Sequence, residues 1–72
     1  MNLRESVLSA VESMNRWADY IEVFNYMKSN DYFLGNSKTP EKSVSSELYK
    51  YAESGVIDRK KEGKLPQYKK KG

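Results

Sequence analysis

The stretch TPEKSVSSELYKYAESGVIDRKKEGKLPQYKKKG, residues 39–72, decides the fold of this 72-residue chain. Thr39 is placed to cap a helix, and Pro40 suits the first helical position, where its missing N–H would have had no intrahelical partner. Gly55 suits a helix stop because it lacks a Cβ atom. Apolar residues recur between them at i, i+4, i+7 and i+8, a stripe about 100° wide that should face a core: Val44, Leu48, Tyr51 and Ala52. The pattern predicts a helix over residues 40–54.

A basic two-stranded hairpin is predicted after this helix. The strands are expected at about residues 56–60 and 67–70, joined by a flexible connection at 61–64. The pattern leaves open whether Ile57 or the residue before it points inward. A hairpin of this size is not stable alone, so we expect it to pack on the helices through Ile57 and Tyr68.

Two shorter helices are predicted in the first half of the chain, at about residues 3–14 and 20–28. Asn2 with Glu5, and Asp19 with Glu22, have the spacing of helix-capping pairs. The apolar residues that follow have helical spacing: Leu3, Val7, Ala10, Val11 and Met14 in the first helix, and Ile21, Phe24 and Met27 in the second.

The segments between the helices also carry aromatic residues. Trp17 stands between the first two helices, where we expect a core anchor and hold a base-stacking platform as the alternative. Residues 29–38 mix turn formers with large apolar residues, which predicts a loop pinned to the body by Tyr32 or Phe33.

The order of these elements predicts the fold class. Three helices followed by a two-stranded C-terminal wing make a mainly α winged helix-turn-helix, here a single domain over residues 1–72. A domain of this size buries only about 60% of the surface that its unfolded chain exposes, so we expect low stability.

Composition argues against several functions. The chain has no Cys and no His, which leaves no disulfide, no thiolate zinc site and no imidazole base near neutral pH. No phosphate-binding loop or metal-ligand spacing occurs, so we expect no catalytic residues, no metal, no cofactor and no enzyme activity. The start of the chain lacks a secretory signal, and no apolar run approaches a membrane span, which predicts an intracellular protein, in the cytoplasm or the nucleoid.

The charge of the chain is divided near residue 58. Residues 1–58 hold six Lys or Arg against nine Asp or Glu, a net charge of −3, whereas residues 59–72 hold seven against one, a net charge of +6. A cationic wing of this kind favours contact with nucleic-acid phosphates. A solvated, solubilising hairpin and a nuclear-localisation-like run are the alternatives. The candidate wing contacts are Arg59, Lys60, Lys61, Lys64, Lys69, Lys70 and Lys71.

The face of the third helix opposite its apolar stripe gives a second set of candidates. Its hydroxyl and ammonium groups suit base edges or phosphates, and they belong to Lys42, Ser43, Ser46, Tyr49 and Lys50. This face has no Arg, Asn or Gln for bidentate base contacts, which predicts weak sequence specificity. An ordinary solvated helix surface is the alternative.

Residues 5–70 resemble the HARE-type winged helix-turn-helix family. The matching features are a second helix beginning near Ala18-Asp19-Tyr20-Ile21, a glycine-containing loop, the helix start Lys38-Thr39-Pro40-Glu41, Ser45 with Leu48 and Tyr49, and the closing hairpin from Gly55 to Tyr68. The resemblance implies a winged-helix fold and DNA binding. Domains of this family usually occur as modules attached to chromatin factors, restriction enzymes or transcription proteins. The Lys-rich wing departs from the family pattern.

These observations favour a small basic DNA-binding protein that regulates transcription or another DNA transaction. Double-stranded DNA is the expected partner, bound through phosphates. The alternative is a protein-interaction module that docks on a larger protein such as RNA polymerase or another host factor, as a related winged helix in the polymerase delta subunit does. We expect a monomer, with pairing of the first helix with its own copy as the alternative.

Overall fold

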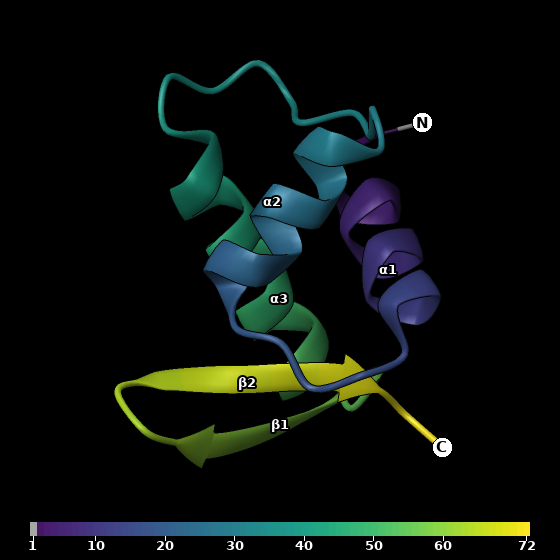
Figure 1. Cartoon of the computed structure of the whole chain (residues 1–72), viewed down its shortest axis with the longest axis vertical. Coiled ribbons are helices and arrows are strands. Elements are labelled where there is room, and N and C mark those ends of the chain that lie inside the picture. Colours follow the sequence, from purple (N-terminus) through teal and green to yellow (C-terminus); the bar gives the residue numbers. More distant parts are fainter. Residues whose placement is uncertain (1) are drawn as a thin grey trace.

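A computed structural model describes residues 2–72 of the chain as three helices and an antiparallel hairpin (Figure 1). The elements are α1 (Leu3–Met14), α2 (Tyr20–Ser29), α3 (Pro40–Glu53), β1 (Ile57–Glu62) and β2 (Leu65–Lys70). This is the winged-helix layout that the sequence predicts, with the hairpin as the wing (residues 57–70). No helix in the described part of the chain is long and apolar enough to cross a membrane.

The first two helices begin at the capping pairs that the sequence indicates. The Oδ1 atom of Asn2 accepts a hydrogen bond of 2.9 Å from the Glu5 N–H. Before α2 the bonds are reciprocal, because Asp19 accepts from the Glu22 N–H at 2.9 Å and Glu22 accepts from the Asp19 N–H at 3.1 Å. Each pair satisfies amide groups that have no partner inside the helix.

The start of α3 differs from the prediction in one respect. Pro40 occupies the first turn as expected, but the Thr39 side chain makes no capping hydrogen bond. Instead, the Thr39 N–H donates a hydrogen bond of 3.1 Å to the hydroxyl of Ser37, which lies in the loop before the helix. The helix ends at Glu53, one residue before the predicted end, and Gly55 follows in the left-handed conformation with φ +78°.

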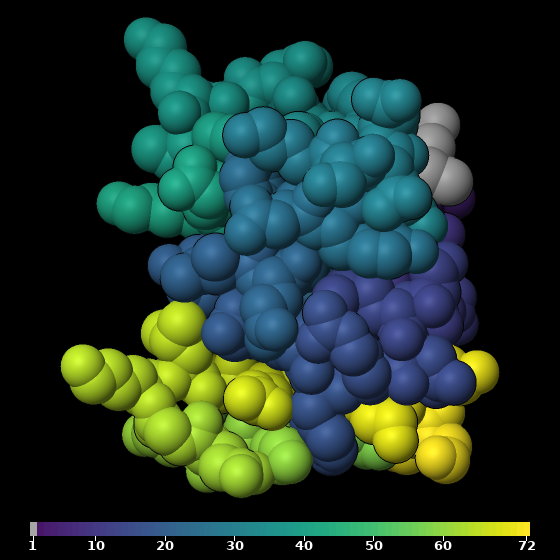
Figure 2. Space-filling model, in the orientation of Figure 1, coloured from purple at the N-terminus to yellow at the C-terminus, as the bar shows by residue number. Residues whose placement is uncertain are grey.

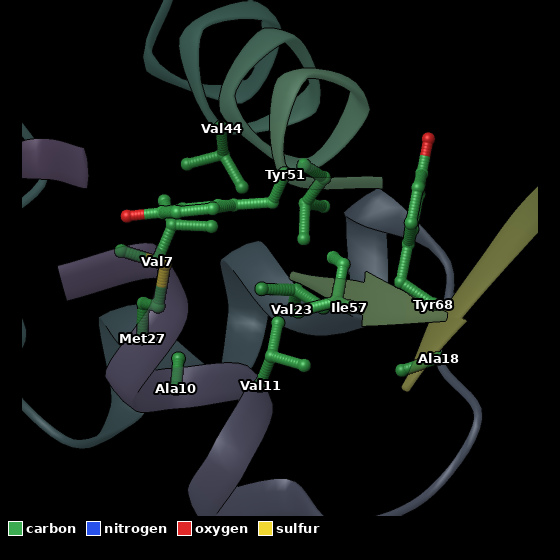
Figure 3. Packing of buried hydrophobic residues seen from close by; sticks show 11 residues of the cluster. Val7, Ala10, Val11, Ala18, Val23, Met27, Val44, Tyr51, Ile57 and Tyr68 are labelled. Atoms are coloured by element: carbon green, nitrogen blue, oxygen red, sulfur yellow. The ribbon is translucent and has the colours of Figure 1, made fainter. Parts of the chain in front are cut away.

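All three helices and the wing contribute to one core (Figure 3). The predicted stripe of α3 is buried at three positions and half-buried at Ala52. The Tyr51 hydroxyl donates to the Arg4 carbonyl at 2.6 Å, which links α3 to α1. The buried apolar residues are Val7, Ala10, Val11, Ala18, Val23, Met27, Val44, Leu48, Tyr51, Ile57 and Tyr68.

Two expectations for aromatic and apolar residues, at Ile21 and Trp17, are corrected, and the predicted anchor of the loop at Tyr32 or Phe33 is confirmed at Tyr32. Ile21 is 45% exposed, and Val23 lies in the core in its place. Trp17 is half-buried and is not part of the core. Tyr32 packs against the body as predicted, with its hydroxyl 3.3 Å from the Ser13 Oγ, but Phe33 is 42% exposed and does not anchor the loop.

The position of Trp17 follows from the pairing of its neighbour Ala18. Ala18 forms a bridge to Tyr68, donating its N–H at 3.0 Å and accepting the Tyr68 N–H at 2.8 Å. Successive residues in extended backbone point to opposite sides. Because Ala18 is turned into the core, Trp17 faces away from it, and this pairing also covers the outer edge of β2.

The wing is longer and its turn tighter than predicted. The strands pair from Ile57 with Lys70 to Glu62 with Leu65, so the turn has two residues instead of the predicted four. Gly63, with φ +75°, takes the first of these positions, where type II′ turns require a positive φ. Ile57 points inward and is 3% exposed, which settles the question left open by the sequence and confirms Ile57 and Tyr68 as the packing contacts.

Candidate nucleic-acid interface

The predicted contact face of α3 lies opposite the core, as its helical spacing requires. Lys42, Ser46, Tyr49 and Lys50 are exposed, and Ser43 is half-buried with its hydroxyl 3.4 Å from the Thr39 carbonyl oxygen. Glu53 lies four residues after Tyr49 and therefore falls in the middle of the same face. An acidic group thus stands among the residues proposed to meet DNA.

The wing divides its cations between two faces. Side chains alternate along a strand, and directly paired residues share a face. The face that holds Ile57 and Tyr68, toward the helices, therefore also carries Arg59, Lys61 and Lys70. The opposite face carries Lys60 and Lys69. The seven predicted wing contacts consequently do not form one patch.

A groove of about 550 Å³ lies between the C-terminal end of α3 and β1. Arg59, on one side of the groove, also contacts α3, with its guanidinium carbon 5.3 Å from the centre of the Tyr49 ring. Cations outnumber carboxylates along the groove by three to two. Its lining residues are Ala52, Glu53, Gly55, Ile57, Asp58, Arg59, Lys61 and Lys71.

Three of the candidate cations already have partners in the chain. Lys60 pairs with Glu62 at 2.9 Å and lies 4.6 Å from the centre of the Trp17 ring. Lys71 donates to the Gly55 carbonyl at 3.1 Å. Lys50 is 3.7 Å from a Glu47 carboxylate oxygen. The ion pairs are exposed at the lysines and therefore weak, but they reduce the charge that a ligand meets.

The tyrosines beside Arg59 remain neutral hydrogen-bonding groups. The Glu53 carboxylate beside the hydroxyl, as acceptor and as negative charge, raises the pKa of Tyr49, and Arg59 acts in the opposite direction. Burial raises the pKa of Tyr68, again with Arg59 opposing. The Tyr49 hydroxyl is therefore neutral at physiological pH, and it can donate to a phosphate oxygen or a base edge only when it leaves the Glu53 carboxylate.

The contact between Tyr49 and Arg59 was not predicted from the sequence. The two residues belong to different elements, and no local spacing indicates that they meet. The place of Glu53, by contrast, follows from helical periodicity.

No protein-family model, no curated protein and no solved structure matches this chain. The resemblance to the HARE-type family therefore remains a prediction that rests on the residues quoted for it.

Proposed function

We propose that this chain is a winged-helix domain that binds double-stranded DNA through phosphate contacts with weak sequence specificity, as a regulator of transcription or another DNA transaction. The observation that carries the proposal is the position of the wing cations: Arg59 and Lys61 lie on the side of β1 that borders the groove beside α3. In a winged helix this arrangement lets a helix and a wing approach the same duplex.

The outline of the molecule supports the same geometry. Figure 2 shows the segment around the start of α3 and the wing tip projecting on the same side of the molecule, with α2 between them. Lys42 is exposed in the first turn of α3, and Lys64 is exposed in the turn of the wing. Cations on these two segments suit the two phosphate backbones that border a groove of DNA.

Weak specificity is proposed because base-reading groups are scarce on α3. Its exposed face offers hydroxyls and lysines but none of the bidentate side chains that distinguish base pairs well. Glu53 in the middle of that face would repel phosphates. Wing contacts would therefore supply most of the affinity. Membership of the HARE-type family is proposed separately, on the residues that carry the resemblance between Ala18 and Tyr68.

Amide shift mapping with a generic duplex tests this proposal. Titration at low salt should perturb residues 42–50 and 59–64 together, because they border one contact surface. Perturbation of residues on the α1 surface alone, or no perturbation at a duplex concentration of about 1 mM, would contradict DNA binding, since non-specific binding is typically stronger than this.

Docking on a larger protein, such as a polymerase, is the second candidate function. It is favoured by the charge of α3, which holds three Glu against two Lys, and by exposed Phe33 and Tyr49. Apolar anchors keep their affinity in salt, whereas phosphate contacts lose it. Retention of a purified partner at about 0.5 M salt would favour docking, and release of every tested partner above about 0.3 M would count against it.

A further inference from the structure

The wing has one covered edge and one open edge. The Tyr68 N–H and carbonyl bond to Ala18, on the side of β2 away from β1. Tyr68 and its partner Arg59 are therefore a pair without mutual backbone hydrogen bonds, and the backbone groups of Arg59 also point outward. The same holds for the alternate residues Ile57 and Lys61.

The outward backbone groups of β1 are free for a ligand. Within residues 2–72, no hydrogen bond from another segment reaches the N–H or carbonyl of Arg59 or Lys61. β1 forms the lower border of the molecule in Figure 1. Its free edge also borders the groove beside α3, which leaves room for a further strand next to it.

An extended peptide is the occupant whose backbone matches this edge. A strand added beside β1 would accept from the N–H groups and donate to the carbonyls of Arg59 and Lys61. Phosphates accept hydrogen bonds but donate none near neutral pH, so a duplex would leave those carbonyls without a protein-like partner. The alternation of donors and acceptors therefore favours a peptide at this edge.

The charges along β1 select among peptides. A second copy pairing edge to edge would place basic side chains of the two strands close together, which is unfavourable, and lysines commonly protect edge strands in this way. The same Arg59 and Lys61 side chains attract carboxylates. We propose that β1 binds an extended acidic segment of a partner protein as an antiparallel strand, with acidic residues at alternate positions opposite Arg59 and Lys61.

This inference goes beyond DNA binding and does not depend on it. In the proposed register, the Glu residues of the peptide face Arg59 and Lys61 directly. A residue opposite an outward-pointing β1 residue directs its own N–H and carbonyl toward β1. The residues between the Glu residues direct theirs toward solvent. The hydrogen bonds of the added strand therefore involve one half of the peptide backbone only.

Backbone methylation of a probe peptide tests this register with the unmodified protein. The probe is a fluorescein-labelled peptide of alternating Thr and Glu that contains three Glu, and anisotropy measures its binding at low salt. Two versions carry N-methyl groups, one on its Glu residues and one on an equal number of its Thr residues, with the same charge. We expect the Glu-methylated peptide to bind about 10-fold or more weakly, because hydrogen bonds to β1 are lost. The Thr-methylated peptide should keep its affinity within about threefold, since its methyl groups face solvent.

Other outcomes would overturn the proposal. Equal affinities of the two methylated peptides would show attraction by charge alone. No binding of the unmethylated peptide at 1 mM would exclude the acidic occupant. A dimer in sedimentation that the peptide does not dissociate would assign the edge to a second copy of this chain.

Discussion

The two faces of the wing allow a test of DNA binding that separates geometry from total charge. Lys61→Gln with Lys64→Gln removes cations from the groove side and the turn. Lys60→Gln with Lys69→Gln removes the same number from the opposite face. Both double variants lower the net charge by two, so any difference between them reports which side of the wing meets phosphates.

The magnitude follows from the cations of the proposed contact surface, of which Arg59 and Lys61 line the groove. Lys42 on α3, with Arg59, Lys61 and Lys64, gives about four phosphate contacts and a slope of log affinity against log salt of about −3.6. Affinity should then fall about 150-fold between 50 and 200 mM salt. A count of about five wing cations from the sequence alone would give a slope of about −4.5, but one of the seven candidates is paired with Glu62 and another donates to a carbonyl.

Removal of Lys61 and Lys64 should halve the slope. About two contacts remain, which gives a slope of about −1.8 and a fall of about 12-fold over the same salt range. The variant with Lys60 and Lys69 replaced should keep a slope near −3.6, because those side chains face away from the groove.

Fluorescence anisotropy with a labelled generic duplex measures both slopes, and circular dichroism confirms that both variants remain folded. Equal loss of slope in the two variants would show attraction by overall charge without a defined contact face. A slope near −3.6, as expected for the unchanged protein, in the variant with Lys61 and Lys64 replaced would refute the proposed contact surface.

Further predictions concern stability and are measured by urea denaturation. Leu48→Ala should cost about 3 kcal/mol, because Leu48 is fully buried. Tyr51→Phe should cost about 1 kcal/mol through the lost bond to the α1 backbone, whereas Tyr49→Phe, at a residue 49% exposed, should change stability by less than about 0.5 kcal/mol. Asp19→Ala should cost about 1 kcal/mol by removing the α2 cap. Burial raises the pKa of Tyr68, so its contribution to stability is complete below the unfolded pKa near 10 and is lost as pH rises through the folded pKa. The decline between pH 9 and 11 should therefore be smaller in Tyr68→Phe, and an unchanged decline would exclude this residue as a cause.

Most of the fold could be predicted because its signals are local. Capping pairs such as Asp19 with Glu22 act over three residues, and the stripe of α3 repeats within one helix. The error at Trp17 has a different origin. The orientation of Trp17 depends on the pairing of Ala18 with Tyr68, two residues that are far apart in the sequence. Local size and polarity alone favour the larger side chain, Trp17, for the core, whereas the core contains Ala18.

The candidate site was less predictable because its residues meet only after folding. Composition locates the cations in the wing but does not show which of them face α3. The contact of Arg59 with Tyr49 depends on how the wing packs on the helices. The second strand was predicted to begin at residue 67, after Pro66, whereas β2 begins at Leu65 and includes this proline. This residue pairs with Lys61 at a position whose N–H would point away from β1, so the proline removes no hydrogen bond between the strands.

The turn at Gly63 connects the fold to both proposals. Its two-residue geometry fixes the register, and the register decides which residues of β1 share a face with Ile57. A shift of one residue would turn Lys60 toward the groove and Arg59 away from it. It would also exchange the backbone groups that are free at the open edge. If the wing binds as proposed, we therefore expect the single glycine that sets the alternation of its lysines to matter more for binding than their number.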